Sequence, residues 1–193
     1  MHESERNLYP LRKIGVAETD LSPLLVPTEA EEVDAARFVR ERIGEAPFVV
    51  IHPGAGKRRN IWPPERFAEV ARRLGGGAGR GGYRVVAVSG PVDAPVLRRF
   101  LAAGAEPAAA VELPPVGFLG ALMKRAALVL CNDTGVMHVA GAVGAGCVAV
   151  FGPTDPARWK PAVDSVVAVR GSDGTVDSVS VEMVLEAARR VLA

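Results

Sequence analysis

The chain has 193 residues, of which 49% are hydrophobic and 23% charged, and its formal net charge is +1. This length suffices for one domain with a sizeable core, and the near-zero charge gives no reason to expect a nucleic-acid partner. The longest apolar run, at residues 143–151, is too short to span a bilayer, and residues 1–10 lack the apolar core of a signal peptide, so we expect a cytoplasmic protein without a transmembrane segment.

The first 46 residues are expected to form an arm followed by one helix. Residues 1–27 show no sustained periodicity and contain prolines, which predicts an extended arm or linker. Thr28 and Glu31 have the spacing of a capping box, and Gly44 is a natural helix end. The helix within residues 28–46 is expected to bury a stripe made of Val33, Ala36, Val39 and Ile43.

From residue 47 onward, strands and helices alternate. Strands are expected at residues 48–51, 83–89, 109–113, 128–131, 147–151 and, at an edge, 166–169. Helices are expected at residues 64–74, 94–103, 118–125, 134–143 and from 181, with a flexible glycine-rich loop at 75–82. The buried stripe predicted for the fourth of these helices consists of Val136, Val139, Ala140 and Val143. Strands that are apolar on both faces predict one α/β domain over residues 47–193, a doubly wound, Rossmann-like parallel sheet.

Three loops follow strand ends, where open parallel sheets bind ligands. In the first, at residues 52–63, Gly54 and Gly56 let the backbone approach a ligand closely. Three consecutive basic residues follow: Lys57, Arg58 and Arg59. This segment is either a solvated basic loop or a diphosphate site, and its position after a strand favours the diphosphate site.

The second segment, at residues 131–141, ends a strand and leads into a helix. Asp133 and Thr134 can cap that helix, and Gly135 leaves free amides at its N-terminus, where an anion is favoured. We expect capping and ligand binding together. His138, within the helix, is either a packing residue or part of the site.

The third loop, at residues 151–161, contains the rigid turn FGPTDP. Thr154 and Asp155 either donate and accept hydrogen bonds with sugar hydroxyls or close the turn on themselves. The residues of this loop do not decide between these two roles.

Three motifs occur together in these loops: HPGAG followed by WPPERF, NDTG followed by MHVA, and FGPTDP. In this order and at these distances they resemble glycosyltransferase family 9, the ADP-heptose:lipopolysaccharide heptosyltransferases. The similarity covers about residues 48–193, which correspond to the family's C-terminal domain. Residues 28–43 look like its interdomain helix. The resemblance implies one half of a GT-B architecture that acts in lipopolysaccharide biosynthesis, in the cytoplasm or peripherally at the inner face of the membrane.

The resemblance also implies a chemistry and a set of contacts. Transfer from an ADP-linked sugar would be inverting and metal-independent, with the nucleotide sugar as substrate and no cofactor. The donor diphosphate would be bound by Gly54, Ala55, Gly56, Lys57, Arg58, Thr134 and Gly135. The donor sugar would contact Asp133 and His138. The nucleoside would lie beside residues 113–117, at Leu113, Pro114 and Val116.

Two departures from the family pattern matter. The family often has Lys-x-Trp-Pro before the helix, whereas this chain has Asn60 at the lysine position and its basic run just upstream. This leaves open which of the three basic residues meets the phosphate. The family's N-terminal domain, which holds the acceptor site and the proposed general base, has no counterpart here, so a separate acceptor-domain chain is a candidate partner.

Three other functions compete with a glycosyltransferase donor domain. The chain could be a non-catalytic nucleotide-sugar-binding or structural subunit that has lost its acceptor half. It could also be part of a sugar-nucleotide epimerase of the same two-domain architecture, although the carboxylate and histidine clusters of those enzymes are not evident. The fourth reading is an α/β domain without a ligand.

Overall fold

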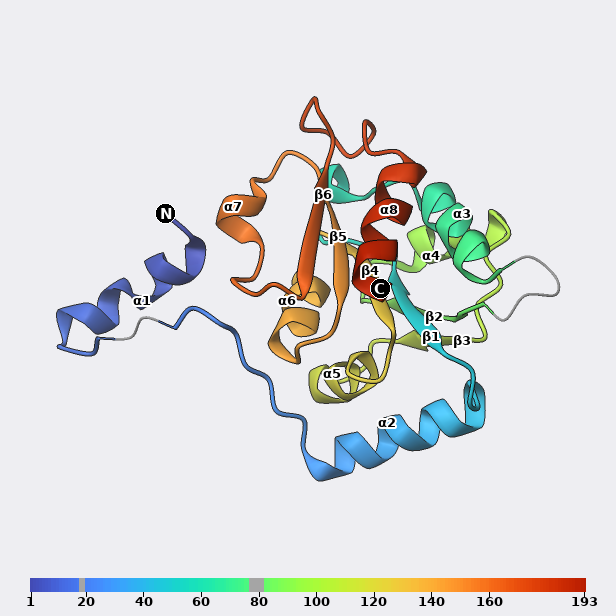
Figure 1. Ribbon diagram of the computed structural model, residues 1–193, viewed down its shortest axis with the longest axis horizontal. Helices are drawn as coiled ribbons and strands as arrows, with labels where there is room; N and C mark the ends of the chain where they lie inside the picture. Colours follow the sequence, from blue (N-terminus) through green and yellow to red (C-terminus); the bar gives the residue numbers. More distant parts are fainter. Residues whose placement is uncertain (18–19, 77–81) are drawn as a thin grey trace.

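Six strands form a parallel sheet in the order β3-β2-β1-β4-β5-β6 (Figure 1), in a computed structural model that describes residues 1–17, 20–76 and 82–193. Their bounds are β1 Phe48–His52, β2 Arg84–Ser89, β3 Ala109–Glu112, β4 Leu128–Asn132, β5 Cys147–Phe151 and β6 Val166–Arg170. The chain runs outward from β1 to β3 and then returns to place β4 on the other side of β1. The predicted doubly wound sheet is confirmed, and its switch point lies between β1 and β4.

The helices surround this sheet. They are α1 Glu3–Lys13, α2 Glu29–Arg42, α3 Pro64–Leu74, α4 Ala94–Ala102, α5 Val116–Met123, α6 Gly135–Ala142, α7 Pro156–Trp159 and α8 Val181–Leu192, with a short 3₁₀ turn, η1, at Arg58–Asn60. From α3 to β6, each predicted element is found within two residues of its expected bounds. None of the helices in the described ranges is long and apolar enough to cross a membrane.

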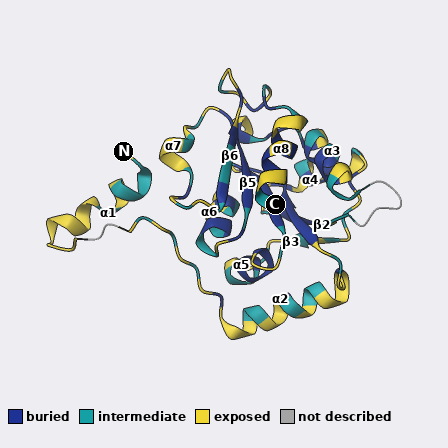
Figure 2. Cartoon of the chain, viewed as in Figure 1, coloured by how far each residue is buried: buried dark blue, intermediate teal, exposed yellow. Residues whose placement is uncertain are grey.

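Alternate strand residues belong to two different cores, one on each face of the sheet. Figure 2 shows that buried residues are concentrated in the central strands. Val49 contacts the face that carries α3, α4 and α8, whereas the next residue, Val50, contacts the face that carries α5 and α6. Both side chains are fully buried. Because a buried valine or leucine side chain contributes about 1.5–3 kcal/mol, burial on both faces of the strands stabilises the fold.

Helix α2 packs along α5, on the outer side of the second core. The predicted stripe is partly wrong: Ala35 is fully buried and Phe38 packs edge-to-face on Phe118 at 5.9 Å, whereas Val33 is 59% exposed. The buried face is set by contact with α5, which the spacing of apolar residues in α2 alone does not reveal. Glu32 adds ion pairs to Lys124 and Arg125, the two residues that follow α5.

The predicted capping box at the start of α2 is present. The Thr28 hydroxyl accepts a hydrogen bond from Glu31 N at 3.3 Å, and Glu31 Oε2 accepts from Thr28 N at 2.8 Å. We expect Thr28→Ala to lower the free energy of unfolding by about 1 kcal/mol, because one helix amide loses its acceptor. Urea unfolding followed by circular dichroism measures this effect. Thr28→Ser, which keeps the hydroxyl, should retain most of the stability, and equal losses in both variants would contradict the capping role.

The N-terminal 27 residues differ from the expected extended arm. Residues Glu3–Lys13 form helix α1, whose N-cap His2 makes a capping box with Glu5. The helix has no buried residue and stands beside α7, to which Glu3 connects it through an ion pair with Arg158 at 2.9 Å (Figure 1). The capping residues outweigh Pro10, which interrupts the pattern and suggested a linker.

Two further segments correct or limit the sequence prediction. In α6 the fully buried residues are Met137, Ala140 and Gly141, while the predicted valines of the stripe are only partly buried. Gly141 lies against Pro161, where a Cβ atom would come within 3.0 Å, so this side of α6 faces a packed neighbour. The centre of the glycine-rich loop expected at residues 75–82, residues 77–81, lies outside the described residues.

Candidate functional site

A pocket of about 370 Å³ opens where β1, β4 and β5 end. It is lined by Gly56, Lys57, Asn60, Asp133, Thr134, Gly135, His138, Thr154 and Trp159. These residues come from all three loops that the sequence singled out, because parallel strands bring their carboxyl ends to one edge of the sheet. The pocket therefore unites the glycine-rich basic loop, the N-terminus of α6 and the turn after β5.

Asp133 lies at the centre of a hydrogen-bond network in this pocket. Its Oδ2 atom accepts from Thr154 Oγ1 at 2.5 Å and from Asn60 Nδ2 at 3.1 Å. Asn60 was not predicted as a site residue, and it is 4% exposed. In the third loop, Thr154 donates to Asp133, whereas Asp155 closes the turn by accepting a hydrogen bond from Ala157 N.

The N-terminus of α6 is free of side-chain caps. The N-cap residue is Thr134, and its hydroxyl makes no capping hydrogen bond; the expectation that Asp133 caps this helix is wrong, since its carboxylate is bound by Asn60 and Thr154. Gly135 faces open space, where a Cβ atom would meet nothing within 4 Å. The unpaired amides and the helix dipole therefore favour an anion at this end of the pocket.

Asn132, the last residue of β4, holds the loop that follows β1. Its Nδ2 atom donates to Pro53 O and to Gly54 O, both at 2.9 Å, and its Oδ1 atom accepts from Trp62 N at 3.0 Å. The side chain is fully buried. Since the C=O and the following N–H of a trans peptide point in opposite directions, this arrangement turns the amide of Ala55 away from Asn132. In the sequence, the feature that could have indicated this role of Asn132 is its position as a polar residue at the end of an apolar strand.

The three basic residues of the first loop point to different places. Lys57 lines the pocket, whereas Arg58 lines a separate hollow of about 500 Å³ together with Arg99 and Asp177. Arg59 is exposed in the same 3₁₀ turn. Lys57 is therefore the basic residue of this run that the fold brings to the pocket.

His138 and Trp159 complete the outer wall of the pocket. Partial burial lowers the pKa of His138, with a smaller opposing effect from the Asp133 carboxylate and a further lowering by His2. Burial thus favours the neutral imidazole, which both donates and accepts hydrogen bonds. Trp159 is 36% exposed, and the Arg158 guanidinium lies 5.0 Å from its ring centroid.

The residues expected near a nucleoside do not line this pocket. Leu113 and Pro114 line a second hollow of about 550 Å³ between α2 and the start of α5, and Val116 is 58% exposed. Leu113 has a positive φ of 51°, and its amide donates to Ser89 O at the carboxyl end of β2. The second hollow therefore lies at the same edge of the sheet, on the β2–β3 side.

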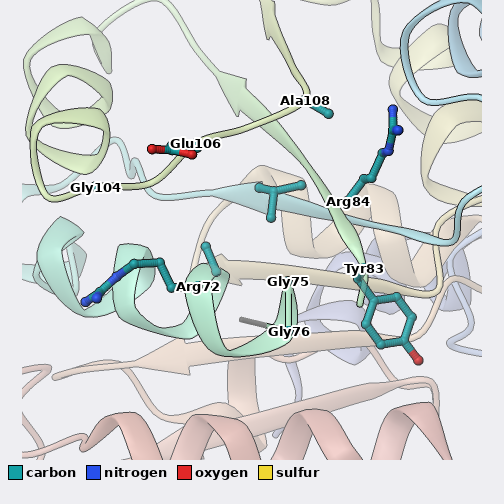
Figure 3. A pocket seen from close by; sticks show the side chains of 10 residues that line it. Arg72, Gly75, Gly76, Tyr83, Arg84, Gly104, Glu106 and Ala108 are labelled. Carbon is teal, nitrogen blue, oxygen red and sulfur yellow. The ribbon is translucent and has the colours of Figure 1, made fainter. Parts of the chain in front are cut away.

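A hollow of about 600 Å³ lies at the opposite, amino-terminal edge of the sheet, between the end of α3 and the start of β2. Figure 3 shows that the charged ends of Arg72, Arg84 and Glu106 point in different directions around it. Arg72 is engaged by Glu69. The polar groups of this hollow do not converge on a common point, so we place the functional site at the carboxyl edge.

Comparison with known proteins identifies the family of the chain. A sequence model of glycosyltransferase family 9 (heptosyltransferase) matches residues 10–187. The chain belongs to glycosyltransferase family 9. The match covers the pocket-lining residues of all three loops, and the earlier resemblance is confirmed. By sequence, the family 9 chain is similar to heptosyltransferases.

Relatives extend this assignment. The chain is 29% identical to lipopolysaccharide heptosyltransferase 3 of Escherichia coli (strain K12) over 175 residues, which cover 86% of this chain and 48% of that protein. It superimposes on a family 9 glycosyltransferase from Veillonella parvula DSM 2008 with a TM-score of 0.83 and 25% identity, covering 99% of this chain and 60% of the other. E. coli ADP-heptose lps heptosyltransferase II has the same fold, with a TM-score of 0.77, 24% identity and coverage of 92% and 55%. The chain spans about half the length of the curated relatives it matches.

Proposed function

We propose that this chain is the donor domain of a heptosyltransferase-type glycosyltransferase and that its pocket binds the diphosphate and sugar of an ADP-linked sugar. The observation that carries the proposal is the convergence of Lys57, the uncapped N-terminus of α6 and the Asp133 carboxylate on one pocket. A cation and free amides suit a diphosphate, and a fixed carboxylate suits sugar hydroxyls. The name of one structural relative, ADP-heptose lps heptosyltransferase II, supports ADP as the nucleotide.

In this proposal the diphosphate lies between two groups of amides. One group belongs to residues 54–57, which we call the phosphate loop, and the other consists of Thr134 and Gly135 at the start of α6. The Lys57 ammonium adds a full positive charge. When the bond to the sugar breaks, negative charge grows on the departing diphosphate, and these preorganised groups stabilise it. As the family resemblance implies, transfer would be inverting and independent of a metal ion.

The other donor contacts follow from the same placement. Asp133 and His138 would bind hydroxyl groups of the sugar, and the neutral form of His138, which burial favours, can donate as well as accept. The nucleoside would extend along the carboxyl edge of the sheet to Leu113, Pro114 and Val116. This direction is supported by the hydrogen bond from Leu113 to Ser89, the last residue of β2.

The acceptor side of the reaction would come from outside this sequence, on a further domain or a partner chain. Support for this comes from the relatives, of which the chain matches only about half. The best-placed carboxylate in the pocket, Asp133, already accepts two hydrogen bonds from Asn60 and Thr154, which suits binding better than proton abstraction. The same observation also favours the second candidate, a non-catalytic nucleotide-sugar-binding or structural subunit.

Calorimetric titration of the purified chain with ADP, UDP and GDP tests the proposal. We expect ADP to bind more tightly than UDP or GDP. Equal binding of all three would contradict an adenosine-specific donor site, and no binding by a folded chain would contradict the proposal as a whole. Glycosyl transfer to an acceptor after addition of the missing half would separate the enzyme from the non-catalytic subunit.

Lys57→Ala is expected to weaken ADP binding by about tenfold, because a charge-assisted hydrogen bond to phosphate contributes roughly 1.5–3 kcal/mol. The matched control is Arg58→Ala, which removes the neighbouring charge from a residue that lines the other hollow. That control should leave ADP affinity within about twofold, and the loss in Lys57→Ala should shrink at high salt. A larger loss in Arg58→Ala would assign the phosphate contact to Arg58 instead.

A further inference from the structure

A buried histidine–carboxylate pair lies directly behind the phosphate loop. His52 is the last residue of β1, and its Nε2 atom lies 2.9 Å from Asp93 Oδ2. Each of the two residues is only 4% exposed. The sequence does not predict this pair, because the two residues are 41 positions apart and belong to different loops. The pair joins the end of β1 to the turn before α4.

Asp93 connects three segments of the chain. The same Oδ2 atom accepts a hydrogen bond from Gly90 N at 2.7 Å, and the Asp93 carbonyl accepts from Leu97 N at 2.8 Å in α4. The hydrogen bond from His52 lowers the pKa of the Asp93 carboxyl, assisted by Gly90 N and opposed by burial. The carboxylate is therefore held in one position by donors from β1 and from the β2–α4 turn.

Gly54 lies against this carboxylate. A Cβ atom at Gly54 would come 2.1 Å from both Cγ and Oδ1 of Asp93, so the carboxylate fills the space that any side chain would need. On the other side, Asn132 Nδ2 binds Gly54 O. The backbone of the phosphate loop thus passes between two buried polar side chains, and the position of Asp93 sets the path that it can take.

The hydrogen bonds also indicate the form of the histidine ring. Within the described ranges, His52 Nδ1 is buried and has no hydrogen-bond partner. A ring with its proton on Nε2 uses its single donor on Asp93 and leaves Nδ1 as a bare acceptor. A ring that also carried a proton on Nδ1 would bury a donor without an acceptor, which costs more. The geometry therefore favours the Nε2–H tautomer.

We infer that His52 and Asp93 are positioning residues that hold the phosphate loop in the shape required for diphosphate binding, without touching the ligand themselves. The inference rests on the proposed function for its binding consequences. Amide groups bind a phosphate well only when they are fixed to within about 0.5 Å. Release of Asp93 from His52 would let the loop move away from the pocket while the sheet and helices stay intact.

The experiment compares His52→Ala and Asp93→Ala with the conservative variants His52→Gln and Asp93→Asn, which can keep a donor and an acceptor at the same places. Hydrogen exchange of the amides at residues 54–57 is measured without ligand, and ADP affinity by calorimetry. We expect faster exchange and about tenfold weaker ADP binding in the two alanine variants. The conservative variants should restore both to within about threefold. Nitrogen NMR of His52 should show an Nε2–H signal that shifts in Asp93→Ala.

Arg99→Ala is the matched control, because it removes an exposed ion pair between α4 and Glu65 without touching the loop. This variant should change neither the hydrogen exchange of residues 54–57 nor the ADP affinity. If Asp93→Ala fails to fold, Gly54→Ala perturbs the same contact from the loop side and should accelerate exchange there. Unchanged hydrogen exchange of the amides at residues 54–57 in His52→Ala would overturn the inference. An equal loss of ADP affinity in Arg99→Ala would overturn it as well. If the wild-type chain binds no ADP but loop exchange responds as expected, the proposed function fails and the positioning role stands.

Discussion

Asn132→Asp is expected to lower the free energy of unfolding by about 3 kcal/mol or more at about pH 7. The substitution keeps the shape of the side chain but replaces the Nδ2 donor, which binds Pro53 O and Gly54 O, with an oxygen that faces both carbonyls. At a fully buried position this introduces a charge whose second oxygen faces two acceptors and no donor. Denaturant unfolding measures the loss. ADP binding should fall in the folded variant, because the Gly54–Ala55 peptide is no longer held.

The pH dependence of this variant gives a second check. Burial raises the folded-state pKa of the introduced carboxyl above its unfolded value, so the penalty is largest at high pH and declines as pH falls. Asn132→Ala loses all three hydrogen bonds of the side chain but introduces no charge, and its deficit should stay nearly constant with pH. If the loss of unfolding free energy depends on pH in the same way in both variants, the proposed repulsion between the carboxylate and the two carbonyl oxygens is wrong.

Asp133→Ala is expected to weaken binding of an ADP-linked sugar by about 10- to 100-fold, because a charged hydrogen-bond acceptor is lost. Binding of ADP alone should change by less than about threefold, since the diphosphate contacts come from Lys57 and the start of α6. Calorimetry with ADP and with an ADP-linked sugar measures the difference. Equal losses for the two ligands would remove the sugar-contact role from Asp133.

Thr154→Val is the matched control for that variant. It removes the hydrogen bond at 2.5 Å to the Asp133 carboxylate but leaves the carboxylate and its contact with Asn60 in place. We expect a loss of sugar-nucleotide affinity no larger than about fivefold, because the carboxylate is then less firmly fixed but still present. A loss as large as that of Asp133→Ala would mean that Thr154 contacts the ligand directly.

The sequence predicted the architecture because its local signals agree with one another. Strands such as residues 147–151 are apolar on both faces, which requires helices on both sides of the sheet. The capping box at Thr28 and the proline at the start of α3 mark helix ends through local hydrogen bonding and backbone geometry. Family motifs around Asp133 indicated the functional edge of the sheet, since they follow strand ends.

The buried faces of the helices were less predictable. The exposed position of Val33 and the burial of Met137 depend on the partner against which each helix packs. Helix α1 was not predicted because it has no buried stripe and contains Pro10. Its capping residues are the sequence signal that indicates it. The buried face of a helix depends on tertiary contacts, and the start of α1 depends on its capping side chains. Hydrophobic periodicity carries no information about either.

The composition and motifs of this chain thus determined its fold class, its family and the three loops that form the site. Tertiary structure alone decided how those loops are used. Lys57 has an extended backbone just before the 3₁₀ turn and lines the pocket, whereas Arg58, the first residue of that turn, lines the other hollow. The partners of Asn132, Asp133 and His52 lie between 21 and 79 positions away, in segments that meet only when the sheet forms. Local sequence cannot specify such contacts, because they depend on strand order and register.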